Sequence, residues 1–239
     1  MVKCKICHAN TKFVFSHKIM KKYKGNYYKC DKCGFLFANK PTWLKEAYKN
    51  SITSEDTGLE ERNILFAEKT SIILKTNFKD SKNFLDYAGG YGLFSKLMKD
   101  NGFNFYWTDP YTKNIYSKEL TWNKKDKIDF ITCFECLEHF KEPNKELQKI
   151  FSISKNVLFS TTVLPEPIPK PDWIYYGFNH GQHIAFYEEK TLKYIANNNG
   201  LNYYKIGNLQ LITKKQINLN KTLIYLYLFY KIPRVLKLI

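Results

Sequence analysis

The sequence from residue 83 to residue 98 is Asn-Phe-Leu-Asp-Tyr-Ala-Gly-Gly-Tyr-Gly-Leu-Phe-Ser-Lys-Leu-Met. An apolar run ends at Asp86, glycines follow, and apolar residues then recur at helical spacing until Asn101-Gly102. Glycine lets the backbone turn sharply and approach a ligand closely. The stretch therefore predicts a strand, a ligand-binding turn and a helix, which together form one unit of an α/β fold.

Further apolar runs extend this pattern along the chain. Residues 103–108 predict a second strand ending at Asp109, which lies 20 positions after Gly89. Rossmann-type folds place a ribose-binding carboxylate at about this distance from the glycines. Residues 128–133 and 157–161 predict two more strands, with a helix beginning near Pro143 between them. Ligands bind at the carboxyl ends of such strands, where the polar residues of this chain are found.

The composition is that of a folded chain with room for one main domain and a small satellite. Of the 239 residues, 44% are hydrophobic and 17% aromatic, which excludes a disordered protein. No segment resembles a secretory signal, and the longest apolar run, Leu223–Tyr230, is too short to span a bilayer. We therefore expect a cytoplasmic protein in which the cysteines bind metal or are buried as thiols.

Four of the six cysteines form two C-x-x-C pairs near the N-terminus. Their arrangement predicts a closed, tetrahedral zinc site in a small ribbon that depends on the metal for its stability. His8 and His17 are interpreted as surface residues because four thiolates complete the site. Cys133 and Cys136 form a third pair without a partner pair, and we interpret them as core thiols. The predicted ligands are Cys4, Cys7, Cys30 and Cys33.

With these motifs the chain resembles the class I S-adenosylmethionine (SAM)-dependent methyltransferases, and more closely their branch with an N-terminal Cys4 zinc module that acts on sugars. The D-x-G-x-G-x-G motif corresponds to Asp86–Gly92, with Ala88 in place of its first glycine, and E-H-x-x-x-P to 138–143. The resemblance covers nearly the whole chain. It implies a Rossmann-like fold, with a mostly parallel seven-stranded sheet and helices on both faces. The cofactor-binding residues implied are Asp86, Ala88, Gly89, Gly90, Gly92, Asp109, Pro110, Phe134 and Glu135.

Two other interpretations of the glycine turn stay open. Dinucleotide binding is disfavoured because the motif begins with an acidic residue in the strand, and because no G-x-G-x-x-G pattern is present. Alternatively, Asp86 and Asp109 only cap turns. A helix over 55–75 precedes the first strand, and we expect Tyr48 or Arg62 near the cofactor carboxylate.

The segment after the fourth strand predicts an acceptor lid. Residues 163–183 contain four prolines and then the aromatic residues Trp173, Tyr175 and Tyr176, which either wall off water, stack on the acceptor or pack on the core. The related sugar methyltransferases carry a G-[QE]-H-[IV]-x-F element, found here at 181–186. Methyl transfer to a hydroxyl needs a proton acceptor, and histidine suits that role. His183 is our first candidate for the general base, followed by His139 and then His180, although each also fits a core or capping role.

Charge is concentrated at the two ends of the chain. Residues 1–50 hold twelve lysines against Asp31 and Glu46, and no acidic residue follows Glu189, while nine lysines or arginines do. Basic ends favour phosphate-bearing partners such as a nucleotide-linked substrate, nucleic acid or an anionic membrane, or they are merely solvated. The tail after residue 221 is basic and amphipathic, and either packs on protein or lies at the inner face of the membrane.

These observations predict an enzyme, a SAM-dependent methyltransferase acting on a hydroxyl of a sugar, nucleotide-sugar or surface-glycan precursor in polysaccharide biosynthesis. An RNA-modifying methyltransferase and a non-catalytic, cofactor-binding partner subunit are the alternatives. The sequence does not define the oligomeric state. The predicted organisation is a zinc ribbon (1–40), a helical linker and cofactor lid (41–80), a SAM-binding domain (81–215) with the acceptor-lid insert (163–183), and the basic tail (216–239).

Overall fold

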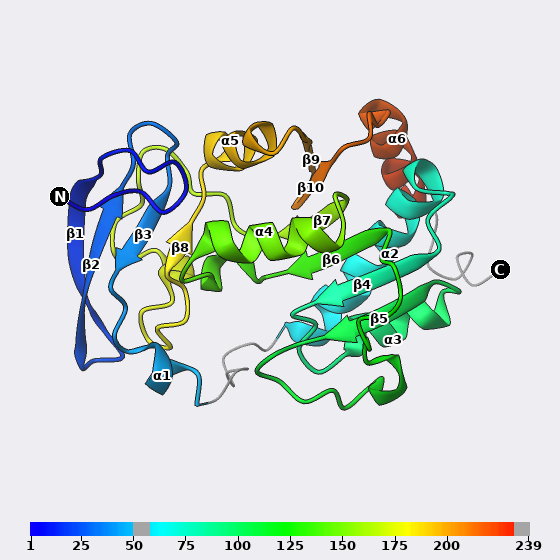
Figure 1. Cartoon of the computed structure of the whole chain (residues 1–239), viewed down its shortest axis with the longest axis horizontal. Helices are drawn as coiled ribbons and strands as arrows, with labels where there is room; N and C mark the ends of the chain where they lie inside the picture. Colours follow the sequence, from blue (N-terminus) through cyan, green and yellow to red (C-terminus); the bar gives the residue numbers. More distant parts are fainter. Residues whose placement is uncertain (50–57, 232–239) are drawn as a thin grey trace.

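A computed structural model describes residues 1–49 and 58–231 of the chain. It contains two sheets, a six-stranded one in the main body and a four-stranded one at the N-terminal end (Figure 1). The six-stranded sheet has the order β5-β4-β6-β7-β10-β9. Its strands are β4 (Asn83–Tyr87), β5 (Asn104–Thr108), β6 (Phe130–Phe134), β7 (Val157–Ser160), β9 (Asn202–Ile206) and β10 (Leu209–Thr213).

The main sheet confirms the α/β fold but corrects its predicted strand count. Strands β5, β4, β6 and β7 are parallel, whereas β10 pairs antiparallel with both β7 and β9. The resemblance implied seven strands, whereas the described residues form six in this sheet; beyond β5 they form only an isolated bridge between Trp107 and Thr121 and the 3-10 helix η1 (Lys118–Leu120). The sequence between Trp107 and Thr121 is mostly polar and lacks the alternation of apolar residues that is typical of a strand with one buried face.

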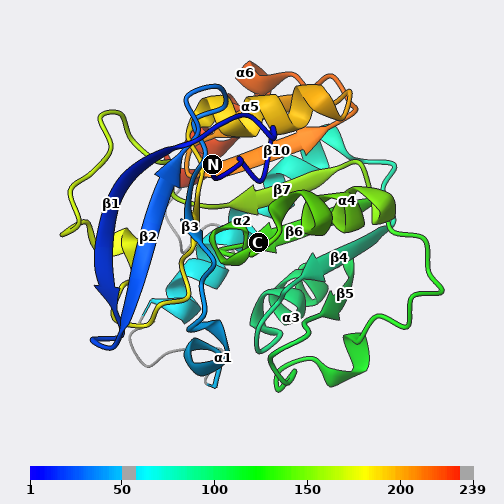
Figure 2. The same ribbon diagram turned by 60° about the vertical axis from the view of Figure 1, so that its left-hand side comes forward.

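Helices cover both faces of this sheet, as predicted. On one face lie α2 (Leu59–Asn77), α3 (Leu93–Asp100) and α6 (Leu219–Lys231), and on the other α4 (Pro143–Ile153) and α5 (Glu189–Asn198) (Figure 2). Adjacent strand residues point to opposite faces, so Phe84 packs in the core with α2 and α3, and Leu85 in the core with α4 and α5. The helix predicted over 55–75 begins at Leu59, and residues 55–57 lie outside the described residues.

The N-terminal sheet is completed by a strand from the distant lid region. It comprises β1 (Lys12–Ile19), β2 (Tyr23–Lys29), β3 (Leu36–Asn39) and β8 (Ala185–Phe186), and all neighbouring strands are antiparallel. Along the chain, β3 is followed by the short helix α1 (Leu44–Ala47). Contacts to the main body reinforce this pairing: the Thr191 hydroxyl donates to the Cys33 carbonyl at 2.7 Å, and Lys29 pairs with the buried Glu188. The N-terminal segment therefore shares its sheet and its core with the residues that follow the lid.

Candidate active site and metal centre

The glycine turn between β4 and α3 is built around the buried carboxylate of Asp86. Its oxygens accept hydrogen bonds from the Ser95 hydroxyl at 3.1 Å and the Thr132 hydroxyl at 3.0 Å, and burial raises the pKa of Asp86 to about 7. A Cβ atom on Gly89 would lie 2.4 Å from Oδ2 of Asp86 and 2.7 Å from Cδ1 of Trp107. Only glycine fits at this position of the turn without displacing its neighbours.

Asp109, at the end of β5, is bonded directly to the glycine turn. Its Oδ2 accepts the Gly90 N–H at 3.0 Å, and its Oδ1 accepts the backbone N–H groups of Tyr111 at 2.7 Å and Thr112 at 2.8 Å. A carboxylate has about four acceptor positions, so these three bonds leave capacity for a ligand hydroxyl. The structure thus brings Asp86 and Asp109 together around one turn.

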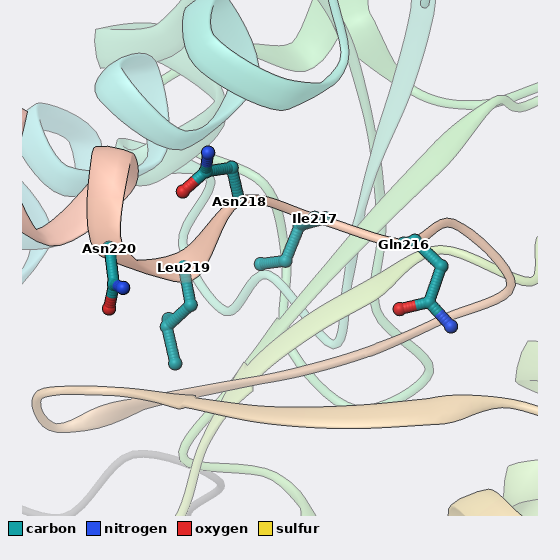
Figure 3. Close-up of a pocket in the computed structure, with 5 residues that line it drawn as sticks. All are labelled: Gln216, Ile217, Asn218, Leu219 and Asn220. Atoms are coloured by element: carbon teal, nitrogen blue, oxygen red, sulfur yellow. The ribbon is translucent and has the colours of Figure 1, made fainter.

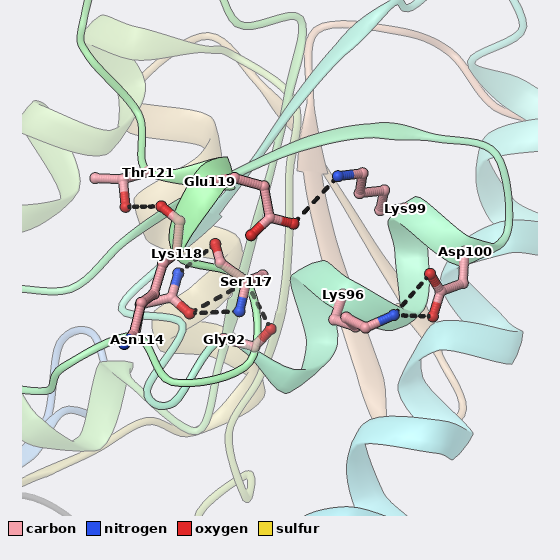
Figure 4. Close-up of polar contacts among 9 residues, drawn as sticks. All are labelled: Gly92, Lys96, Lys99, Asp100, Asn114, Ser117, Lys118, Glu119 and Thr121. Atoms are coloured by element: carbon pink, nitrogen blue, oxygen red, sulfur yellow. Dashed lines mark hydrogen bonds and ion pairs between the residues drawn. The ribbon is translucent and has the colours of Figure 1, made fainter.

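The segment after β5 supports the far end of the turn. The Ser117 hydroxyl donates to the Gly92 carbonyl at 3.0 Å, and the Asn114 side chain exchanges two hydrogen bonds of 2.8 Å with the Ser117 backbone (Figure 4). Gly92 has φ +86°, and a Cβ atom there would lie 2.3 Å from the Asn114 oxygen. These buried contacts hold the start of α3, whose first free N–H groups suit an anionic ligand.

The remaining predicted cofactor residues lie at the carboxyl ends of β4, β5 and β6. Ala88 has φ +58°, a left-handed conformation that is unfavourable for a residue with a Cβ atom. Pro110 follows Asp109 and is exposed. Phe134 packs against Phe66 of α2, with ring centroids 4.6 Å apart, and the Glu135 N–H donates to the Ser160 hydroxyl at 2.9 Å.

A second polar cluster joins residues from distant parts of the chain. Glu138 and His139 lie on the 3-10 helix η2 (Leu137–His139) after β6, whereas His183 lies just before β8. One nitrogen of each histidine and an oxygen of Glu138 all lie within 4.8 Å of one another. The structure therefore brings the two histidine candidates together, beside a glutamate whose position the sequence motif contained but whose role it did not indicate.

Hydrogen bonds and burial define the protonation of these groups. Nδ1 of His183 lies 2.6 Å from the Tyr175 carbonyl, and Nδ1 of His139 lies 3.2 Å from the Gln182 carbonyl. A carbonyl only accepts, so each Nδ1 carries the proton and each Nε2 keeps its lone pair. Burial lowers the pKa of His183 and lowers that of His139 to about 3, which keeps both rings neutral.

Glu138 is fully buried, and its two oxygens differ in their surroundings. The Tyr175 hydroxyl donates to Oε1 at 2.9 Å, whereas Oε2 has no hydrogen-bond partner among the described residues. Burial, together with the nearby charge of Glu135, raises the pKa of Glu138 to about 8. Most of this carboxyl is therefore protonated at neutral pH.

Segment 163–183, the predicted acceptor lid, divides its aromatic side chains between the N-terminal sheet and the cluster of Glu138, His139 and His183, which we call the acceptor cluster. The Tyr175 oxygen also accepts the Thr162 N–H at 3.0 Å and lies 3.1 Å from the Thr161 hydroxyl, which fixes the lid to the end of β7. By contrast, Tyr176, in the 3-10 helix η3 (Ile174–Tyr176), is buried against Phe178 of the same lid, and Trp173 packs on it. Of the three predicted wall residues, only Tyr175 bonds to the acceptor cluster.

The other residues predicted to lie near the acceptor or the cofactor are His180, Tyr48 and Arg62. His180 accepts the Gln182 N–H at 3.1 Å through Nδ1, which is a local capping role. The Tyr48 ring stacks on Tyr111 at 5.2 Å and meets the His139 ring edge-on at 6.2 Å, so it lies between the cofactor turn and the acceptor cluster. Arg62 is half-buried in the first turn of α2.

The four N-terminal cysteines form a compact cluster. The sulfurs of Cys4 and Cys33 are 3.5 Å apart, those of Cys7 and Cys30 are 3.4 Å apart, and all four lie within 4.8 Å of one another. Tetrahedral zinc with Zn–S bonds of about 2.3 Å separates its sulfurs by about 3.8 Å, so the cluster fits that ion. Neither predicted surface histidine joins it, since His8 is exposed and His17 stacks on Phe178 at 4.1 Å. Both cysteines of the third pair are core thiols, as predicted.

The sheet order, the glycine turn and the carboxylates at the strand ends are those of the class I methyltransferase fold. The family described as methyltransferase domain matches residues 60–206, and this chain belongs to it. The protein is a SAM-dependent methyltransferase, and SAM is its cofactor. No curated protein sequence matches the chain significantly.

Solved structures share the fold at low sequence identity. Magnesium protoporphyrin IX methyltransferase from Synechocystis PCC 6803, with bound SAH, is 12% identical with a TM-score of 0.50, over 73% of this chain and 98% of that one. An O-methyltransferase family 2 protein from Planctomyces limnophilus, in complex with apigenin, is 14% identical with a TM-score of 0.50, over 72% and 65%. For mitomycin 7-O-methyltransferase, the identity is 13% and the TM-score 0.43, over 62% of this chain and only 53% of that protein.

Proposed function

We propose that this enzyme methylates a hydroxyl group of a sugar, a nucleotide-linked sugar or a surface-glycan precursor. The observation that carries the proposal is the cluster of Glu138, His139 and His183, whose polar atoms lie within 4.8 Å of one another after β6. Two imidazole lone pairs accept hydrogen bonds, and the protonated Glu138 donates one. An acceptor with adjacent hydroxyls matches this set, because each hydroxyl both donates and accepts.

His183 is the general base in this proposal. Its Nδ1–H is held by the Tyr175 carbonyl, so Nε2 is oriented to take the proton of an acceptor hydroxyl. His139 is the weaker base because burial lowers its pKa to about 3, and it instead orients the acceptor by accepting a hydrogen bond. Tyr175 and the lid hold these groups and exclude water. SAM, when bound, supplies the electrophilic methyl group, and Asp86, Gly89 and Asp109 would hold it.

The basic ribbon supports a phosphate-bearing acceptor. Residues 1–50 carry a net charge of +10, and through β8 their sheet lies next to His183 in sequence and space. A positive surface beside the acceptor site attracts an anionic diphosphate group. The same charge would suit RNA, so the test of the proposal has to separate these two acceptors.

We also propose that Zn²⁺ occupies the four-cysteine cluster in a structural role. The sulfur separations support this, as does the arrangement of the four side chains, whose sulfurs all lie within 4.8 Å of one another. With four protein ligands, no position remains for a reacting water. Metal analysis of the purified protein should find about one zinc per chain, and a metal-free, fully folded protein would contradict the assignment.

The acceptor is tested by incubating the protein with methyl-labelled SAM and a cell extract. We expect the label in small phosphatase-sensitive molecules or in extracted glycan, and its loss with His183→Gln. His8→Gln is the matched control, since His8 is exposed on the ribbon. Nuclease-sensitive label in the acid precipitate would overturn the sugar proposal in favour of RNA.

A further inference from the structure

Helix α6 carries an outer face that is both apolar and aromatic. Its inner side is anchored, because Leu226 packs in the core with α2 and the Thr222 hydroxyl accepts the Asn77 amide at 2.9 Å. The outer side is formed by Leu223, Ile224, Tyr225, Tyr227, Leu228 and Tyr230, which are 40–58% exposed. We call these six residues the outer face of α6. Folding leaves this face in water at the end of the molecule away from the ribbon (Figure 1).

The charge around the outer face has one sign. Helix α6 contains no acidic residue, and its two lysines lie at its ends. Nζ of Lys221 lies 5.7 Å from the Tyr225 ring centroid, and Nζ of Lys231 lies 4.8 Å from that of Tyr227. Each ammonium group thus borders the apolar surface. In the sequence, the 50 residues after Glu189 include nine lysines or arginines and no acidic residue.

We propose that the outer face of α6 docks on an anionic lipid surface. A helix that lies in a membrane interface has an apolar side rich in aromatic and aliphatic residues, with basic residues that reach the lipid phosphates. Tyrosine suits this boundary because its ring is apolar and its hydroxyl is polar. A second copy of this chain is the poorer occupant, because it would place the lysines of both helices together.

The helix lies on the membrane rather than across it. Its 13 residues extend for about 20 Å, whereas the hydrocarbon core of a bilayer is about 30 Å thick. None of the helices within 1–49 and 58–231 is long and apolar enough to cross a bilayer. A hollow of about 440 Å³ at the start of α6 is lined by Gln216–Asn220 (Figure 3). Its amide side chains place polar groups next to the apolar face, as an interface requires.

The test is co-sedimentation of the full chain with vesicles of phosphatidylcholine alone or mixed with phosphatidylglycerol. We expect binding to the mixed vesicles only, weakening as salt is added because the lysines are screened. The triple variant I224S/Y227S/L228S should lower the partition coefficient at least about tenfold, since three exposed apolar side chains leave the interface. Lys221→Gln with Lys231→Gln should weaken binding to the anionic vesicles by about tenfold.

A control substitution on the ribbon tests whether vesicle binding depends on the outer face of α6 or on exposed aromatic side chains in general. Phe13 is 55% exposed and Tyr227 is 58% exposed, so Phe13→Ser removes a similar exposed ring elsewhere and should leave vesicle binding unchanged. Thermal melting checks that each variant is folded. Equal binding to both vesicle types, no binding at low salt, or a stable dimer that the triple variant dissociates would overturn the proposal. An acidic protein partner would be indicated if anionic vesicles fail to bind but an acidic polypeptide does.

Discussion

The cofactor half and the acceptor half of the site are built in different ways. Asp86, Gly89 and Gly92 lie within one short stretch of sequence, which is held by hydrogen bonds from β6 and from the segment after β5. Glu138, Tyr175 and His183 come instead from a strand end, a lid and the start of β8. The first half lies within the main sheet and the segments between its strands, whereas the second exists only when the ribbon, lid and sheet have packed together.

This difference predicts that a substitution in one half impairs the function of that half and spares the other. Damage to the glycine turn should weaken SAM binding, whereas damage to the ribbon or lid should abolish transfer while SAM still binds. The dependence follows from the sheet itself, since β3 pairs with β8 two residues after His183. The segment that follows β3 also fixes the lid, because the Trp43 side chain donates a hydrogen bond to the Gly181 carbonyl at 2.7 Å. Five experiments test the contrast.

The largest effect is expected for His183→Gln. Loss of a general base lowers kcat by about 100-fold to 10,000-fold, while SAM affinity, measured by calorimetry, should stay unchanged. His17→Gln is the control, because His17 stacks on the lid residue Phe178 but lies outside the acceptor cluster. An unaltered kcat for His183→Gln would remove this residue from the chemistry and leave His139 as the base.

Cys30→Ser, or zinc removal with a chelator, should disrupt the acceptor half through the ribbon. We expect methyl transfer to fall about 100-fold, because the ribbon loses the metal that folds it and β8 loses its partner strand. Binding of SAM should change by less than about threefold. Cys133→Ser is the matched control, as this core thiol lies outside the cluster. Parallel loss of both properties would show that the two halves are not separable.

Gly89→Ala should instead damage the cofactor half and weaken the binding of SAM. The added Cβ would lie 2.4 Å from the Asp86 carboxylate, and overpacking of this kind costs about 1–3 kcal/mol, or roughly tenfold to a hundredfold in SAM affinity. Gly200→Ala is the control: it also has positive φ, at +65°, but an added Cβ would meet nothing within 4 Å. It should lower stability without weakening SAM binding, which isothermal titration would show.

Each half also contains one buried carboxyl group, and pH distinguishes them. The pKa of Glu138 rises from 4.5 to about 8 and that of Asp86 from 3.8 to about 7, so the native state holds protons that the unfolded chain releases. The free energy of unfolding therefore falls as pH rises through these windows, by up to about 1.4 kcal/mol per pH unit for each group. Between pH 7 and 8 the fall belongs mainly to Glu138.

Denaturant titrations of Glu138→Gln and Asp86→Asn measure these two contributions. Glu138→Gln should flatten the slope between pH 7 and 8, whereas Asp86→Asn should flatten it only below about pH 7. A slope that persists in Glu138→Gln would mean that this carboxyl is already ionised in the folded protein, and the proposed donor role of Oε2 would be wrong.

The smallest effect, and the only stabilising one, is expected for Ala88→Gly. Ala88 has φ +58°, and relief of this strain, less the greater freedom of glycine in the unfolded chain, should add about 0.5–1 kcal/mol. The melting temperature should rise by about 1–4 °C. Ala67→Gly, within helix α2, should lower it instead. A lower melting temperature for Ala88→Gly would show that the Ala88 methyl contributes packing that outweighs its strain.

Sequence alone defined the local features. The glycine turn, the carboxylate at Asp109 and the helix starting at Pro143 are each marked by residues close together in the chain, and each was predicted. Spacing alone likewise identified the four cysteines that the structure gathers. Periodicity and turn chemistry act over a few residues, so a single sequence displays them directly.

Only the tertiary structure decided what depends on distant partners. It gave the main sheet six strands instead of the implied seven, paired β8 with the ribbon, and showed that Tyr175 and Glu138 share a hydrogen bond across two loops. It also placed Tyr176 in the core of the N-terminal sheet, against Phe15 and Tyr27. Strand pairing and side-chain direction are decided by which surfaces bury together, and that competition takes place among residues far apart in the chain.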